Sequence, residues 1–180
     1  TSGELATGGR YDPASDAYVD VYAREDLSLN NVQVTFTYGA VYYVKLTGGD
    51  SMYGLGLLLH SEGGTGIAAS VKDGRSGSKA DIAFIAADAP IKDIKLKSGI
   101  TGYDLNGQTM GEFAFDADMD GDGDTTDGTA VYLTRYARKI QVDGDALGDV
   151  LIGGTEPGTG VSLSQFKNKS EGYHGDLVTA

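Results

Sequence analysis

The stretch Val32–Tyr38, VQVTFTY, alternates apolar and polar side chains along its whole length. Such period-two alternation of β-branched and aromatic residues is typical of a strand with one buried face. Runs of the same kind or short apolar runs bounded by turn residues recur along the chain: 17–23, 40–46, 54–62, 66–71, 81–90, 91–97, 112–115, 130–136, 139–142, 149–152 and 161–166. No segment has an apolar stripe of helical period over ten or more residues. The pattern therefore predicts an all-β chain.

These strands favour an antiparallel sandwich of the jelly-roll-like kind, with a calcium-binding loop between two of its strands. Residues 1–16 are small, polar and rich in turn formers, so we expect an extended N-terminal arm there. Residues 17–180 then form a single β domain, which agrees with a length of 180 residues.

An internal repeat leaves a second architecture open. The segment 94–107 matches the segment 140–153 in the frame Ile-x-Leu/Val, then Gly, then Leu-x-Gly, at an offset of 46 residues. The segment Val44–Gly48 begins a third candidate copy. Short strands separated by Gly at regular intervals are also typical of the coils of a short β-solenoid, which is the alternative fold.

The composition restricts the partners. The formal net charge is −12, which argues against nucleic acid and against an anionic membrane surface. The absence of Cys excludes disulfides and thiolate metal sites. The chain begins at Thr1 without a basic and apolar leader, as a processed mature chain or an excised fragment would. Its acids are 20 Asp and 6 Glu beside 28 Gly, a bias typical of turns and of loops that hold hard cations.

One acidic stretch stands out between the strand-like runs 112–115 and 130–136. It carries six carboxylates within twelve residues: Asp116, Asp118, Asp120, Asp122, Asp124 and Asp127. Like charges about 6 Å apart repel by roughly 0.7 kcal/mol per pair even in water, so the empty loop is loose. Ca²⁺ reverses this repulsion because it takes six to eight oxygen ligands. The six aspartates are therefore the predicted calcium ligands.

This stretch resembles the DxDxDG class of calcium loops found in EF-hands, dockerins and thrombospondin type 3 repeats. Counted from Asp116, the loop has Gly121 at position six and Asp127 at position twelve, where an EF-hand has Glu. Counted from Asp118, Gly123 takes position six and Thr129 position twelve. The resemblance implies Ca²⁺ as the bound ion over about 13 residues.

The stretch does not suit other metal ions. Mg²⁺ keeps its waters and seldom uses an all-protein cage, and transition metals prefer His or Cys, which are not near the stretch. An acidic loop without any ion is the alternative. Further acids offer a second site or a solvated surface: Asp50, Asp143, Asp145 and Asp149.

The chain carries no recognisable catalytic signature. Its two histidines, His60 and His174, stand in no nucleophile, zinc-hydrolase or nucleotide-binding motif. We therefore expect no enzymatic activity, no catalytic residues and no organic cofactor.

A low-affinity calcium loop works where calcium is millimolar, which predicts an extracellular or cell-surface protein. The sequon at Asn168 permits glycosylation there. We expect a structural subunit that binds copies of itself into a surface filament, tube or layer by strand or arm exchange, with the segment 11–23 as donor strand. The alternative is a calcium-dependent carbohydrate-binding or adhesin module, in which some of the 11 Tyr stack on sugars. Neither function involves nucleic acid or membrane insertion.

Overall fold

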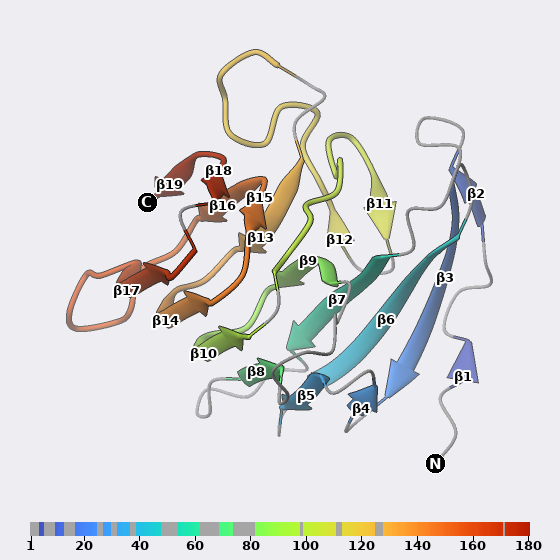
Figure 1. The fold of residues 1–180 in the computed structure, drawn as a ribbon, viewed down its shortest axis with the longest axis horizontal. Helices are drawn as coiled ribbons and strands as arrows, with labels where there is room; N and C mark the ends of the chain where they lie inside the picture. The colour runs from blue at the N-terminus through green and yellow to red at the C-terminus, as the bar shows by residue number, and fades with distance from the viewer. Residues whose placement is uncertain are drawn as a thin grey trace.

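The computed structural model describes residues 4–5, 10–12, 17–24, 27–29, 32–36, 39–47, 54–61, 69–73, 82–97, 99–110, 113–124, 128–170 and 172–180. Within these ranges every regular element is a β-strand, so the all-β prediction is confirmed for this part of the chain (Figure 1). Among the same residues there is no helix with the length and hydropathy to cross a bilayer.

The larger sheet has nine strands and holds both ends of the described chain (Figure 1). In spatial order its strands are β1 (Glu4–Leu5), β3 (Ala17–Arg24), β6 (Gly39–Thr47), β7 (Gly54–Ser61), β9 (Ile82–Ala87), β13 (Thr129–Leu133), β16 (Asp149–Ile152) and β19 (Leu177–Thr179), with β2 (Arg10–Asp12) also paired to β3.

The second sheet has six strands. In spatial order they are β17 (Leu163–Asn168), β14 (Ala137–Val142), β10 (Ile91–Leu96), β8 (Ala69–Asp73), β5 (Val32–Thr35) and β4 (Leu27–Leu29). Two small pairs complete the fold: β11 (Thr109–Met110) with β12 (Phe113–Ala114), and β15 (Ala146–Leu147) with β18 (Tyr173–His174).

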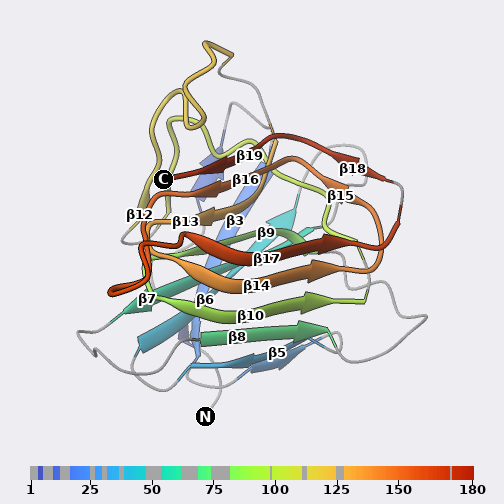
Figure 2. The same ribbon diagram turned by 90° about the vertical axis from the view of Figure 1, so that its left-hand side faces the viewer.

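The chain winds through these sheets as successive coils. From β9 onward it passes from the larger sheet to the smaller one and back, so that β9, β13, β16 and β19 pair in parallel, as do β10, β14 and β17 (Figure 2). A third side is formed by Ile100, which bridges in parallel to Ala146, and by β15 with β18. This connectivity is that of the solenoid alternative, and the antiparallel sandwich is not confirmed. Antiparallel pairing prevails before β7, for instance between β3 and β6.

The 46-residue repeat corresponds to the pairing of two coils. Ile94 pairs with Ile140 and Leu96 with Val142, both at the predicted offset. The proposed third copy is wrong, because Val44 lies on β6, in the other sheet and antiparallel to both neighbours. The next coil is shorter, since Ile140 pairs with Phe166. The long coil therefore contains an insertion, which leaves the stack after Gly102 and returns at Gly128.

The interior of the coils is apolar. Strand β10 points Ile91, Ile94 and Leu96 inward, and each is fully buried. They pack with inward residues of the larger sheet such as Ile85 and Val131 in one continuous cluster. Since parallel coils repeat the same strand phase, each inward position stacks on the same position of the next coil.

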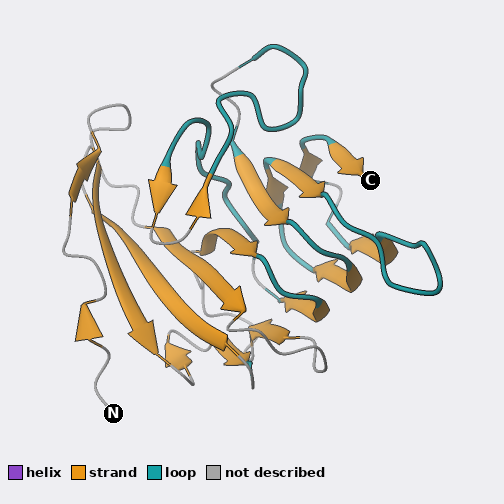
Figure 3. Cartoon of the chain, turned by 180° about the vertical axis from the view of Figure 1, so that it is seen from behind, coloured by secondary structure: helices purple, strands orange, loops and turns teal. Residues whose placement is uncertain are grey.

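The described residues of the insertion, which spans 103–128 and is drawn beside the larger sheet in Figure 3, pack against outward side chains of β7 and β9. Outward residues Leu58, Phe84 and Ala86 form a second cluster with apolar side chains of the insertion, among them Leu105 and Phe115. Strand β9 is consequently buried at every position. This double burial explains why its sequence is a continuous apolar run without alternation.

The predicted N-terminal arm is partly strand. Within residues 1–16, β1 and β2 both pair antiparallel with β3. The predicted donor segment 11–23 falls on β2 and β3, and β3 pairs with β6 of the same chain. In this structure the segment is thus held in its own sheet, and residues 13–16 lie outside the described ranges.

One corner of the coils is built on close backbone approach. A Cβ added at Gly148, whose φ is +106°, would collide with the carbonyl oxygen of Gly128 and lie 3.1 Å from the amide nitrogen of Ala130. The approach is close because the Asp149 amide donates a 2.8 Å hydrogen bond to that carbonyl, which joins two coils.

We expect Gly148→Ala to lower the free energy of unfolding by about 2–4 kcal/mol, because it adds a steric clash to the strain of a left-handed backbone. The control is Gly158→Ala, whose φ is +87° but whose added Cβ meets nothing within 4 Å. Its cost is expected to be about 1 kcal/mol from backbone strain alone. Urea unfolding of both variants measures the difference. Equal losses would mean that the two coils do not approach closely at Gly148.

Candidate metal centre

The acidic stretch is a loop of the insertion that starts after β12 and ends at β13 (Figure 3). It is anchored at both ends by backbone bonds. The Gly107 amide donates to the Asp116 carbonyl at 2.8 Å, and Tyr103 and Thr129 exchange two hydrogen bonds of 3.0 and 2.8 Å. In between, the Met119 amide donates to Oδ1 of Asn106 at 3.2 Å. The loop therefore stands on a fixed base.

Asp118 organises the curvature of this loop. Its Oδ1 accepts the Gly121 amide at 2.8 Å and its Oδ2 accepts the Gly123 amide at 3.0 Å. Both glycines have positive φ, of 81° and 94°. Only Gly adopts such angles without cost, so alternating Asp and Gly allow the chain to wrap around one carboxylate.

Two further aspartates follow in short local turns. Oδ1 of Asp120 accepts the Asp122 amide at 3.3 Å, and Oδ1 of Asp122 accepts the Asp124 amide at 2.7 Å. These bonds fix the carboxylates against their own backbone, as Asx turns do. The spacing of the Asp120 and Asp122 carboxylates is therefore set by these turns.

The loop brings three of the six predicted ligands together. One ligand oxygen from each of Asp118, Asp120 and Asp122 lies within 4.8 Å of the other two. Ligands 2.3–2.6 Å from a calcium ion lie up to about 5 Å from one another, so this spacing fits one Ca²⁺. The three carboxylates are only partly buried or exposed, which leaves room for water as further ligands.

The proximity of like charges is visible in Asp120. Its pKa is raised, first by desolvation among its neighbours and then by the negative charge of Asp122 and the side chain of Asp118, against a lowering by the Asp122 amide. A carboxylate must be ionised to bind a metal ion, so the raised pKa means that protons compete with an ion at this loop as the pH falls.

The remaining predicted ligands lie elsewhere. Asp116 and Asp124 are exposed and are not part of the three-carboxylate group. The pKa of Tyr132 is raised by burial and then by the charge of Asp116. Asp127 and Asp50 lie outside the described residues. In the part of the loop that the structure describes, three of the six predicted ligands therefore form the candidate site: Asp118, Asp120 and Asp122.

The suggested second site does not form around Asp143. Its carboxylate accepts a 2.7 Å hydrogen bond from Nε2 of Gln141 and lies 3.1 Å from Nζ of Lys169. The hydrogen bond from Gln141, and then Lys169, lower the pKa of Asp143 against a smaller rise from desolvation. Within the described ranges, neither Asp143 nor Asp145 joins a group of acids with metal-ligand spacing.

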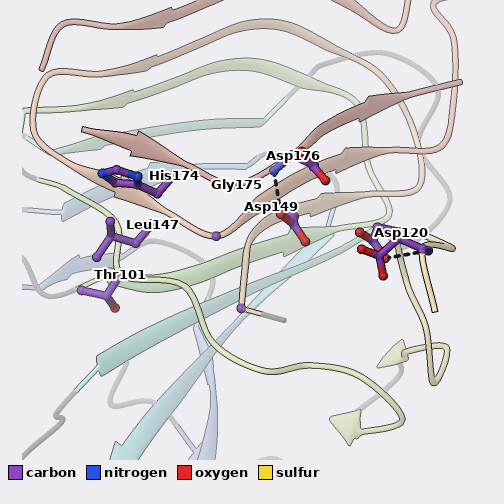
Figure 4. Close-up of a pocket in the computed structure, with 10 residues that line it drawn as sticks. Thr101, Asp120, Leu147, Asp149, His174, Gly175 and Asp176 are labelled. Carbon is purple, nitrogen blue, oxygen red and sulfur yellow. Dashed lines mark hydrogen bonds between the residues drawn. The ribbon is translucent and has the colours of Figure 1, made fainter. Parts of the chain in front are cut away.

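A hollow of about 500 Å³ adjoins the loop (Figure 4). Asp120 and Asp122 line one side, and Asp149, His174 and Asp176 line the other. Asp149 is 7% exposed, and its Oδ1 accepts the Asp176 amide at 2.7 Å. The stacking of β16 on β19 brings these residues together, and their separation in sequence does not reveal it. Among the described residues that line the hollow there is no Tyr.

The other histidine has a structural role. Nδ1 of His60 lies 2.5 Å from Oδ2 of Asp88, whose Oδ1 accepts the Ser61 amide at 2.6 Å. The ring also meets Phe113 edge-on, at 6.4 Å between centroids. The group ties the end of β7 to the turn after β9 and to the insertion.

Comparisons with known proteins give no match for this chain. No family model matches this sequence, and no curated protein and no solved structure is similar enough to match it. The three-aspartate group by itself does not identify one family of calcium loops.

The acids beside the hollow act on Tyr173, whose pKa is raised to about 12 by burial and by the charges of Asp149 and Asp176. The folded chain therefore keeps this phenolic proton to higher pH than the unfolded chain, where Tyr titrates near 10. We expect the free energy of unfolding to fall as the pH rises from about 10 to about 12, and Tyr173→Phe to remove that part of the fall.

Ultraviolet titration of the wild type minus Tyr173→Phe measures this directly. Tyr136→Phe is the matched control for the loss of one chromophore. The difference curve is expected to have its midpoint near 12, as the raised pKa requires. A midpoint near 10 would show that neither burial nor the charges of Asp149 and Asp176 raise the pKa of this phenol.

Proposed function

We propose that this chain is an extracellular calcium-binding structural protein, a subunit of a filament, tube or layer on a cell surface. The observation that carries the proposal is the group of Asp118, Asp120 and Asp122, whose ligand oxygens lie within 4.8 Å of one another on a loop with a fixed base. The loop projects from an all-β scaffold, and the protein acts through binding and assembly rather than catalysis.

The donor set favours a hard cation such as calcium over transition metals that prefer His or Cys. All three side chains offer carboxylate oxygens, which suit hard cations. The three residues are exposed enough to leave several positions to water or to backbone carbonyls, which agrees with the flexible coordination of Ca²⁺. Such a partly hydrated loop site is of the low-affinity kind, with a dissociation constant of about 10⁻⁴–10⁻³ M, and this range supports an extracellular location.

Assembly is supported by sheet edges. In the described part of the chain, β4 and β17 form the two edges of the smaller sheet. An edge strand presents unpaired amides and carbonyls and can accept a strand from another copy. The segment 11–23 lies on β2 and β3, and β3 pairs with β6 of the same chain. In a polymer the segment would instead pair with β6 of a neighbouring copy.

Removing one ligand tests the calcium site. We expect Asp120→Asn to weaken Ca²⁺ binding at least about tenfold, because it removes a ligand charge while its Oδ1 still accepts the Asp122 amide. The control Asp93→Asn makes the same charge change on β10, away from the loop. Isothermal titration calorimetry at pH 7 measures both affinities.

Calcium is also expected to raise the unfolding free energy of the wild type by about 2.7 kcal/mol at 100 times the dissociation constant. A wild type that releases no heat with calcium and keeps its melting temperature contradicts the proposed site. Equal affinities in the two variants would place the ion elsewhere.

Assembly is a separate expectation. Calcium is expected to convert the purified chain into filaments, tubes or layers, because neutralising the acidic loop lowers repulsion between copies that each carry a formal charge of −12. Electron microscopy and sedimentation, with and without chelator, measure this. A chain that stays monomeric at every calcium concentration contradicts the polymer, and binding to glycans by such a monomer would favour the adhesin alternative.

A further inference from the structure

The outer face of the smaller sheet is basic, although the whole chain is strongly acidic. Strands β8, β10, β14 and β17 hold six of the 14 Lys and Arg of the chain and only two of its 26 Asp and Glu. The six are Lys72, Lys92, Lys95, Arg138, Lys139 and Lys167. All are exposed except the half-buried Lys139. The chain therefore has one basic face although its formal net charge is −12.

The pairing register orders these charges into rows across the strands. Lys72 pairs with Lys95, Lys95 with Gln141, and Gln141 with Lys167. Neighbouring strands lie about 4.8 Å apart, so this row crosses four strands in about 14 Å. The sheet stands as an uncovered ladder at the front of Figure 2. The result is a line of three lysines, interrupted between Lys95 and Lys167 by Gln141, which is 6% exposed.

Nearby acids neutralise only part of this face. Arg138 bonds Oε1 of Glu156 at 2.6 Å, and Lys139 pairs in register with Asp93. Asp143 pairs with Lys169, and the charge of Lys95 also helps to lower the pKa of Asp143, after the hydrogen bond from Gln141 and the contact with Lys169. Among the described residues, no side-chain hydrogen bond or ion pair involves Lys72 or Lys167. At physiological salt, charges more than about 8 Å away are largely screened, so a ligand on this face meets the local positive charge rather than the net charge of the chain.

We propose that this face binds a linear acidic polysaccharide, a chain with one carboxylate on each sugar. The fit is one of charge complementarity and of shape. Anionic groups along an extended polymer can contact a line of lysines that crosses four strands. Binding is independent of the calcium loop, which belongs to the insertion on the larger sheet.

The observations favour this occupant over two others. In the acidic loop of a second copy, three of the six carboxylates are gathered in a group within 4.8 Å, which is too short to cover a row that spans four strands. Duplex nucleic acid carries paired phosphate rows on a wide cylinder, whereas this row is a single line of three lysines with a Gln between two of them.

The test measures binding of polygalacturonate, a linear polymer of galacturonic acid, by the full chain at about 0.15 M salt with chelator present, where the net charge of the chain is screened. The chelator excludes calcium bridges, so the result does not depend on the proposed calcium site. We expect saturable binding, no binding of neutral dextran, and weaker binding of a DNA duplex. The double variant Lys95→Gln/Lys167→Gln is expected to bind polygalacturonate about tenfold more weakly and to lower the slope of log affinity against log salt by about 2.

The matched control is Arg24→Gln/Lys45→Gln, which removes the same charge from β3 and β6 of the larger sheet and is expected to bind as the wild type does. Melting temperatures confirm that both variants fold. Absence of polygalacturonate binding by the wild type, or equal loss in both double variants, overturns the proposal. Tighter binding of DNA assigns the face to nucleic acid. Loss of calcium-driven assembly in the first variant alone, with polygalacturonate binding intact, assigns it to a second copy.

Discussion

The register between parallel coils is the constraint on which the rest of the structure depends. Ile94 on Ile140, and Ile140 on Phe166, stack one inward position through three coils and keep the interior apolar. A slip by one residue would turn every inward side chain outward, so this register is strongly specified. The outward positions follow from it without further choice, because the same alternation that buries Ile94 and Leu96 exposes Lys95 between them. The apolar core and the charged row are therefore two faces of one pairing.

The sequence predicted the strands better than their arrangement. Alternation and β-branched residues mark a strand, yet they are the same in parallel and antiparallel sheets, so they could not exclude a sandwich. The repeat at an offset of 46 residues does correspond to the pairing of Ile94 with Ile140. The insertion lengthens this coil, however, so the following coil has another length and the repeat does not continue. The continuous apolar run of β9 also needed the structure, because its second buried face depends on Leu105 and Phe115 from the insertion.

The candidate site shows the same division. Alternating Asp and Gly indicated a curved acidic loop, since local turns depend on neighbouring residues, and the structure gathers Asp118, Asp120 and Asp122 there. The sequence could not show that Asp149 and Asp176 line the same hollow as this loop, because their approach follows from the stacking of β16 on β19. Composition likewise concealed the basic face, since a sum over the chain carries no information about which strand faces which way.

The paired hydrogen bonds between Tyr103 and Thr129 close the insertion at its base. The chain leaves and re-enters the coil stack at neighbouring positions, so the residues between Tyr103 and Thr129 form an insertion whose two ends lie side by side. Leu105 and Phe115 inside this span pack on the larger sheet, whereas the exposed positions 121–124 lie outside that cluster. A foreign peptide inserted at these positions is expected to be displayed to solvent, while the bonds between Tyr103 and Thr129 hold the two ends of the insertion together.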